Sequence, residues 1–277
     1  MDMRYPPTPE AFKRYTTDEI RAAFLIEKLF TSGQITLVYS HIDRVIVGGA
    51  APTGGPLELA ADRQDLGADY FLERREVRVI NVGGAGRVVV DGTAYPMDKL
   101  DGLYIGMGAR SVRFESADAS QPAHFYFTST PAHQTYPPAH IPIREAEPIH
   151  LGDDAHSNKR TIYKYIHPDG VRSCQLVMGV TLLAPNNLWN TMPVHTHARR
   201  MEVYFYFDIT GDNVVFHLLG EPGETRHIVM RDQQAVFSPS WSIHSGMGTG
   251  NFSFIWAMAG ENQTFTDMDA VAMADLR

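Results

Sequence analysis

Short runs of hydrophobic residues, separated by polar turns, follow one another along most of the chain. The clearest runs are rich in Val, Ile, Tyr and Phe and span residues 77–82, 87–90, 202–207 and 252–258. Turn sequences such as Gly83-Gly84 and Asp91-Gly92 interrupt them. Many short strands at close spacing predict an all-β fold of sandwich or barrel type.

The first thirty residues follow a different pattern, which predicts one amphipathic helix. Thr16 and Glu19 form a capping-box signature, and apolar residues follow at helical spacing: Ile20, Ala23, Phe24 and Leu29. The apolar face of this helix could bind a partner, but packing against its own domain is the favoured interpretation. We therefore assign residues 1–30 to an N-terminal helical segment without a function of its own.

A length of 277 residues favours two domains of modest size. Residues 130–148 contain five prolines in irregular polar sequence, which is typical of a connector. The predicted boundary lies there, with an N-terminal domain at 31–135 and a C-terminal domain at 149–277.

A faint internal repeat suggests that the two domains are alike. Residues 74–77 resemble 199–203, and residues 103–109 resemble 236–242 in the same order. Similarities this short also arise by chance between strands of similar composition, so duplication and independent origin both stay open.

Composition and charge narrow the classes of function. The formal net charge of −8 disfavours nucleic acid and acidic membrane surfaces as partners. The longest run without charge or histidine, residues 173–194, contains Pro185 and Pro193 and three asparagines, so it predicts no membrane helix. A single cysteine, Cys174, and an N-terminus without an apolar signal core favour a cytoplasmic protein.

The strongest chemical signal is an H-x-H-x4-E motif formed by His195, His197 and Glu202. Alternate residues of a strand share a face, so the two imidazoles can point at one site, and Glu202 can enter from the neighbouring strand. About forty residues later, His244 follows a proline-led turn and is the natural fourth ligand. Two imidazoles and a carboxylate suit a divalent transition metal.

Most of the twelve histidines need no such role. A lone histidine is more often a hydrogen-bonded core or surface residue than a ligand, and we assign that interpretation to the histidines in polar, loop-like sequence: His133, His140, His150, His156 and His167.

The two histidine motifs resemble those of the cupins, which are small β-barrels of jelly-roll type, although Trp241 stands where the second motif usually has glycine. This resemblance implies a bicupin with two jelly-roll β-barrels. In the first half, Asp69 and Phe71 would stand in place of the first two histidines, Glu76 would match Glu202, and Ser111 would replace His244. We therefore expect no metal in the N-terminal domain.

Longer stretches resemble a narrower family, the 5-keto-4-deoxyuronate isomerases, and the similarity covers nearly the whole chain. They are VYSHIDR from Val38, YFLERRE from Tyr70, NLWNTMPVHTH from Asn187, RRMEVYFYF from Arg199, ETRHIVM from Glu224, SPSWSIHSG from Ser238 and GENQTF from Gly260.

The resemblance implies a zinc-dependent aldose-ketose isomerase of pectin breakdown that binds one zinc per chain and assembles as a homohexamer. It implies that the zinc ligands are His195, His197, Glu202 and His244. The catalytic base stays unassigned. Candidate substrate contacts are Tyr204, which shares its strand phase with Glu202 and with Tyr206, and further along the chain Arg226 and Trp241.

Two other functions fit the same motifs. Three histidines and a glutamate also suit iron or manganese in a metal-dependent dioxygenase. A bicupin that binds a sugar without catalysis is the third possibility.

Overall fold

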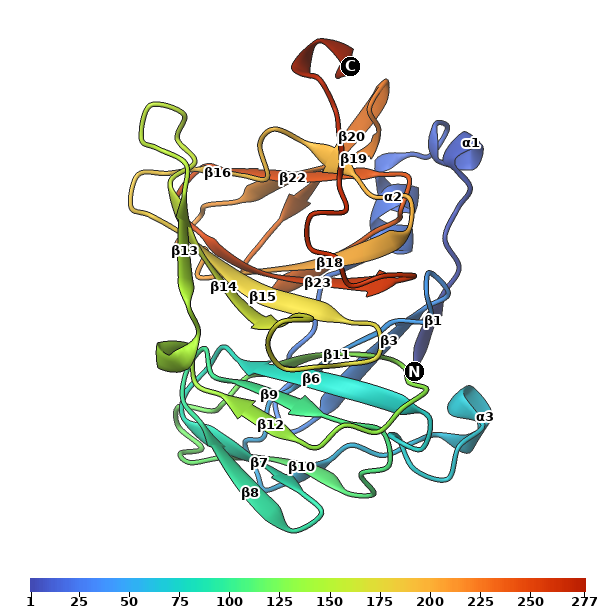
Figure 1. Cartoon of the computed structure of the whole chain (residues 1–277), viewed down its shortest axis with the longest axis vertical. Coiled ribbons are helices and arrows are strands. Elements are labelled where there is room, and N and C mark those ends of the chain that lie inside the picture. The colour runs from blue at the N-terminus through green and yellow to red at the C-terminus, as the bar shows by residue number, and fades with distance from the viewer. The chain divides into compact units, whose positions relative to one another are not determined.

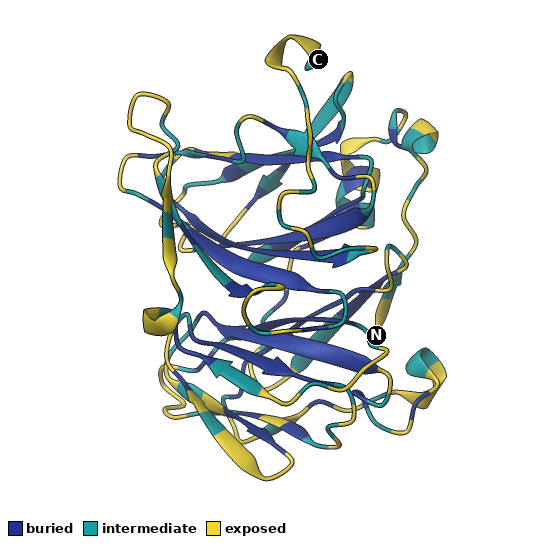
Figure 2. Ribbon diagram, viewed as in Figure 1, coloured by how far each residue is buried: buried dark blue, intermediate teal, exposed yellow.

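The structure is a computed structural model that describes residues 1–277, and the chain divides into two compact units. The first unit comprises Met1–Arg4, Lys28–Ala146 and Tyr165–Leu176, and the second comprises Tyr5–Glu27, Glu147–Lys164 and Val177–Arg277. Strands dominate both units (Figure 1). The all-β fold predicted from the sequence is confirmed, and the buried residues follow the strands while exposed residues lie mainly in the connections (Figure 2).

The first unit contains a seven-stranded sheet and a four-stranded sheet. The larger sheet has the order β1 (Asp2–Arg4), β3 (Ile35–Ser40), β4 (Ile46–Ala50), β11 (Phe125–Pro131), β6 (Arg75–Asn81), β9 (Gly102–Ile105) and β12 (Ala139–Ile141). The smaller has the order β5 (Leu57–Glu58), β10 (Val112–Ser116), β7 (Gly86–Val90) and β8 (Thr93–Met97). One apolar core, which includes Val77, Phe114 and Phe127, draws on both sheets. A short helix, α3 (Arg63–Leu66), and a 3₁₀ turn, η1 (Ile143–Glu145), lie outside the sheets.

The second unit repeats this plan. Its seven-stranded sheet has the order β13 (Pro148–Leu151), β14 (Arg160–Ile166), β15 (Val177–Leu183), β23 (Ser253–Gly260), β18 (Arg200–Phe207), β21 (Gln234–Ser238) and β2 (Leu25–Ile26). Its four-stranded sheet has the order β16 (Trp189–Asn190), β22 (Ile243–Gly248), β19 (Val215–Glu221) and β20 (Glu224–Met230). A two-stranded ribbon pairs β17 (His195–Thr196) with β24 (Asp269–Ala270), and a 3₁₀ turn, η2 (Met273–Asp275), follows.

The N-terminal helical prediction is confirmed in part of its range. Two helices form, α1 (Pro9–Phe12) and α2 (Thr17–Phe24), and β2 follows directly. The capping box is present, because the Glu19 amide donates to Thr16 Oγ1 and the Thr16 amide donates to the Glu19 carboxylate. Their buried side chains include Phe12, which packs against Phe24 and Trp241. The apolar face of the helices therefore belongs to the core of the second unit.

The connector at 130–148 is less irregular than predicted, because residues 139–141 form β12 and extend the first sheet by one strand. The predicted Asp91-Gly92 turn joins β7 to β8, and both residues have positive φ angles, 47° and 86°. Turns of this hand match the twist of a hairpin.

The strand orders support duplication. The succession β4, β11, β6, β9 in the first unit corresponds to β15, β23, β18, β21 in the second, and the smaller sheets correspond strand by strand. One local feature recurs at the same point. Gly48 lies opposite Phe127, and Gly179 lies opposite Trp256, so in each unit a glycine leaves room for a large ring on the neighbouring strand.

The registers correct one detail of the repeat. When the two units are aligned on these glycine and ring pairs, Val77 of β6 occupies the position of Glu202 of β18. The sequence comparison paired Glu76 with Glu202, which is one residue out of phase, and a shift of one residue moves a strand side chain to the opposite face. Val77 points into the apolar core, whereas Glu76 is fully buried on the other face beside Arg78.

Candidate metal centre

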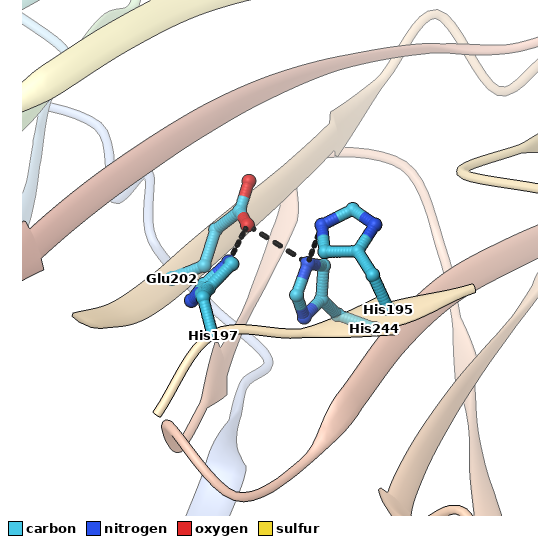
Figure 3. A group of neighbouring side chains, drawn as sticks. All are labelled: His195, His197, Glu202 and His244. Carbon is cyan, nitrogen blue, oxygen red and sulfur yellow. Dashed lines mark hydrogen bonds and ion pairs between the residues drawn. The ribbon is translucent and has the colours of Figure 1, made fainter. Parts of the chain in front are cut away.

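The four residues predicted as metal ligands converge on one point in the second unit (Figure 3). His195 lies in β17 and His197 follows that strand, Glu202 lies in β18, and His244 comes from β22 in the other sheet. The site therefore joins the two sheets of the sandwich. Three of the four side chains are almost completely buried, and His195 is partly exposed.

The Glu202 carboxylate lies at the centre of the group. Its Oε2 atom is 3.1 Å from His197 Nε2 and 3.0 Å from His244 Nε2, and the Nε2 atoms of His244 and His195 are 3.0 Å apart. One ligand atom from each residue lies within 4.8 Å of all the others.

The backbone orients one of the imidazoles. His197 Nδ1 lies 3.0 Å from the carbonyl oxygen of Arg200, to which it can donate, so that Nε2 keeps its lone pair for the group. The carbonyl is available because residues 197–200 turn between β17 and β18, and the Arg200 amide in return donates to the His197 carbonyl. The four residues between His197 and Glu202 thus form the turn, and the turn supplies the carbonyl oxygen that orients the His197 imidazole.

The protonation states of His195 and Glu202 suit a cation. For His197, burial alone would lower the pKa, but the hydrogen bond and charge of Glu202 outweigh it and raise that pKa. Burial and the neighbouring His244 lower the pKa of His195 to about 3, which keeps its imidazole neutral at ordinary pH. Burial alone would raise the pKa of the Glu202 carboxyl, but His244 and His197 outweigh it and hold that pKa well below its usual range. A neutral imidazole beside an ionised carboxylate is the state that ligates a metal.

These residues fit a divalent transition metal. Zinc bonds of about 2.0–2.1 Å to nitrogen or oxygen place neighbouring ligand atoms of a tetrahedron roughly 3.3 Å apart, and the contacts of 3.0–3.1 Å are close to that value. His244 Nδ1 is buried and has no hydrogen-bond partner, so the polar contacts of this ring are those that its Nε2 atom makes with Glu202 and His195. The set of three imidazoles and one carboxylate could therefore hold a metal ion.

A cavity opens onto two of these residues, His195 and Glu202. Most of its wall is hydrophobic, and the polar residues besides the ligands are Arg160, Thr181 and Tyr204. The apolar residues of the wall are Ile162, Phe254, Trp256, Met258, Phe265 and Met268. Its volume is about 70 Å³, which is enough for about two water molecules or for one end of a small organic molecule.

The segment after β23 completes this wall and is fixed by the two arginines of the motif. Arg199 forms ion pairs with Asp267 and Asp269, and Arg200, which is fully buried, donates to the carbonyl oxygens of Thr264 and Asp267. The ribbon between β17 and β24 also pairs His195 with Ala270. The wall and His195 are therefore held together by the same contacts.

The structure brings some sequence-predicted substrate residues to the cavity and gives others different partners. Tyr204 lines the cavity, and its hydroxyl is 2.8 Å from Thr191 Oγ1. Tyr206 forms a buried hydrogen bond with His217.

Arg226 and Trp241 are not among the residues of the cavity wall. Arg226 forms an ion pair with Glu224 and donates to the carbonyl oxygen of Lys13, and Trp241 packs against Phe12.

Sequence reasoning missed the wall residues Arg160, Phe265 and Met268. Arg160 begins β14 in a run of mixed polar and apolar residues, and the other two lie in an irregular segment. No local motif marks these positions, because their role depends on which strands the fold brings together.

Gly179 keeps the Trp256 wall in position, and we expect Gly179→Ala to disturb it. A Cβ atom at Gly179 would lie 2.3 Å from Trp256 Cζ2 and 2.4 Å from the backbone oxygen of Tyr163. Overpacking of this kind costs about 1–3 kcal/mol, so the melting temperature should fall and the indole should shift toward the cavity. Differential scanning calorimetry measures the first effect and Trp fluorescence the second. Gly223→Ala is the matched control, because nothing lies within 4 Å of its added Cβ atom; equal stability of the two variants would contradict the prediction.

Comparison with known proteins matches residues 24–274 to the model of the KduI/IolB family. The relatives named 4-deoxy-L-threo-5-hexosulose-uronate ketol-isomerase include proteins from Halalkalibacterium halodurans, 60% identical, and Caldicellulosiruptor bescii, 59% identical. A relative with the same name from Yersinia pestis is 53% identical. Each match covers 100% of both chains.

Solved structures support the fold. An IolB-like protein from Salmonella typhimurium superposes with a TM-score of 0.72 at 13% identity, covering 90% of this chain and 96% of that one. Bacillus subtilis oxalate decarboxylase gives a TM-score of 0.59 at 11% identity, covering 88% and 78%. The cupin-type architecture expected from the motifs is confirmed. In addition, none of the helices is long and apolar enough to span a membrane.

Proposed function

Because this chain belongs to the KduI/IolB family, we propose that it converts 5-dehydro-4-deoxy-D-glucuronate to 3-deoxy-D-glycero-2,5-hexodiulosonate with one bound zinc ion per chain. The chain is an enzyme, an intramolecular oxidoreductase of the ketol-isomerase type, as are its full-length relatives. The observation that carries the proposal is the convergence of His195, His197, Glu202 and His244 beside an apolar cavity.

The reaction moves a carbonyl group from the first carbon of an open-chain sugar acid to the second. In the enediolate route, a proton leaves the second carbon and another reaches the first, and negative charge develops on the oxygens between these steps. Zinc, when bound, supplies Lewis-acid stabilisation of that charge without changing its own oxidation state.

The chain's own residues contribute binding and proton control. Burial and the Glu202 charge raise the pKa of Tyr204 well above its usual value, so its hydroxyl is protonated and can donate to a substrate oxygen. The apolar wall of the cavity limits access of water, which strengthens such hydrogen bonds. We assign Tyr204 to substrate binding and leave the base that removes the carbon-bound proton unassigned.

The proposal extends to the setting of the enzyme. The named relatives act on a hexosulose-uronate, which supports a role in the breakdown of pectin and other polyuronates. Together with the single cysteine, this supports a cytoplasmic enzyme, and the resemblance to the family supports a homohexamer.

The proposal is tested by running the reaction in heavy water under argon with the zinc-loaded protein. Redox-neutral isomerisation through an enediolate requires neither oxygen nor nicotinamide, and solvent deuterium should appear at the product carbon that receives the proton. Nuclear magnetic resonance of the product gives both the turnover and the position of the label.

Other outcomes separate the alternatives. Strict dependence on oxygen would favour a cupin dioxygenase, and saturable binding of the uronate without turnover would favour a non-catalytic sugar-binding bicupin. Product without deuterium would retain the isomerase assignment but count against an exchanging enediolate, since a hydride shift carries the substrate hydrogen across.

A further inference from the structure

Arg160 is the one arginine or lysine on the wall of the cavity that holds His195 and Glu202. Its side chain is half-buried, and its Nη1 atom donates a hydrogen bond to the carbonyl oxygen of Asn158 at 2.8 Å. It forms no ion pair with a carboxylate of the protein, unlike Arg199 and Arg226 in the same unit. A guanidinium group with free donors therefore faces a largely apolar cavity.

A charge in such surroundings is costly unless an opposite charge accompanies it. Burial lowers the pKa of Arg160, which shows that the surroundings disfavour its charge, yet a guanidinium group keeps its proton at any ordinary pH. Because no carboxylate of the protein forms an ion pair with Arg160, an anion from outside the protein can supply the counter-charge. A carboxylate or a phosphate matches the fork of donors in shape and charge, and the substrate of the proposed function carries a carboxylate.

The position of Arg160 also matches a substrate whose charge lies far from its reacting end. Arg160 lies in β14 and Glu202 in β18, and β15 and β23 separate these strands in the sheet. Three steps of about 4.8 Å between neighbouring strands place the two backbones roughly 14 Å apart along the sheet. Both residues line the same cavity, so a ligand that contacts Arg160 at one end can reach the Glu202 group at the other.

We propose that Arg160 binds the carboxylate of the substrate and so directs its aldehyde end toward the metal centre. This inference rests on the proposed function, in which the substrate carries its carboxylate and its reacting carbonyl at opposite ends of six carbons. Arg160 is then a specificity residue that selects a sugar acid over a neutral sugar. The contact is the same before and during the reaction, so it lowers KM and leaves kcat nearly unchanged.

Two other cations are the competing candidates. Arg226 has Glu224 as its counter-charge and a backbone carbonyl as a second partner. Lys164 follows Arg160 on the same face of β14, and its Nζ lies 5.4 Å from the centre of the Phe265 ring. Neither residue belongs to the cavity wall.

The test compares the keto-deoxyuronate with its methyl ester, which differs only in the charge of the carboxyl group. The proteins are the zinc-loaded wild type, Arg160→Met, Arg160→Lys, Arg226→Met and Lys164→Met, each with its zinc content and melting temperature measured. We expect Arg160→Met to raise KM for the acid by about 10- to 100-fold, the range for a hydrogen-bonded charge, and to leave kinetics with the ester unchanged. Arg160→Lys should restore part of the preference for the acid, and the other two variants should keep all of it.

Three results would overturn the inference: an equal loss for acid and ester in Arg160→Met, an unchanged KM in that variant, or loss of the preference in Arg226→Met or Lys164→Met instead. The first two leave the isomerase function standing.

Calorimetric titration of the same proteins with acid and ester separates the two proposals. If the wild type binds the acid more tightly than the ester but does not turn it over, and Arg160→Met alone loses this difference, the proposed function fails while the role of Arg160 is supported.

Discussion

Replacing His244 with alanine is expected to empty the metal site and reduce kcat/KM by at least about a thousandfold. The substitution removes one of four ligands and leaves the Glu202 carboxylate without one of its two imidazole neighbours. Lewis-acid stabilisation is worth several kcal/mol, and each 1.36 kcal/mol corresponds to about a factor of ten in rate. The fold should survive, because neighbouring side chains on β22 still pack in the core. The same loss is expected for His195→Ala and His197→Ala.

The measurements are zinc per chain by elemental analysis after gel filtration, turnover of the keto-deoxyuronate, and far-ultraviolet circular dichroism. His227→Ala is the matched control, since His227 is an exposed histidine on strand β20, in the same four-stranded sheet as β22. If His244→Ala kept a full equivalent of tightly bound zinc, His244 would not be a ligand.

Glu76→Gln is expected to destabilise the first unit by about 3–5 kcal/mol while leaving the bound metal untouched. The Glu76 carboxylate accepts hydrogen bonds from the amides of Cys174 and Gln175 and from the Tyr104 hydroxyl, and it forms an ion pair with Arg78. Both members of the pair are fully buried. Removing the charge leaves a buried guanidinium uncompensated, which is the costly way to break such a pair.

Acid sensitivity provides a second readout of this change. Burial would raise the pKa of Glu76, but Arg78 and the two amides outweigh it and lower the pKa. A carboxyl whose pKa is lowered on folding stabilises the protein at neutral pH, and this contribution disappears as the pH falls through the folded-state pKa. Part of the acid sensitivity of the wild type should therefore be absent in Glu76→Gln.

Urea denaturation at several pH values measures both effects. Glu115→Gln is the control, because Glu115 pairs with Arg87 at the surface of the same unit, where such a pair is worth less than about 1 kcal/mol. Loss of bound metal in Glu76→Gln with the fold intact would mean that the first unit contains a metal site.

The sequence was sufficient for the features that depend on local patterns. The strands at 77–82 and 202–207 appear as β6 and β18 with shifts of one or two residues, because their apolar runs are bounded by turn residues. The convergence of the four candidate ligands could be predicted because His195, His197 and Glu202 lie within one short motif, whose spacing reflects the turn between two strands.

Features that depend on distant partners could not be predicted in the same way. Arg160 reaches the cavity because the sheet places β14 three strands from β18, and no motif encodes that order. Arg226 was a candidate substrate contact because it lies in a stretch that resembles the family, yet it forms an ion pair with Glu224. The pairing of Glu76 with Glu202 was out of phase by one residue, because the register is fixed by Gly48 and Gly179 opposite their rings rather than by the charged residues.

The first unit has a valine at the position where the second unit has a glutamate, and this difference has a consequence for how the molecule evolves. At the same point of a repeated scaffold, Val77 packs in a hydrophobic core and Glu202 lies buried among three imidazoles. A buried cluster of charged and polar groups is usually less stable than hydrocarbon of the same volume. The second unit, which contains the His/Glu group, is therefore expected to lose stability at this position. Selection on catalysis must therefore act against a steady mutational drift toward apolar residues in the second unit, whereas in the first unit drift and stability favour the same residues.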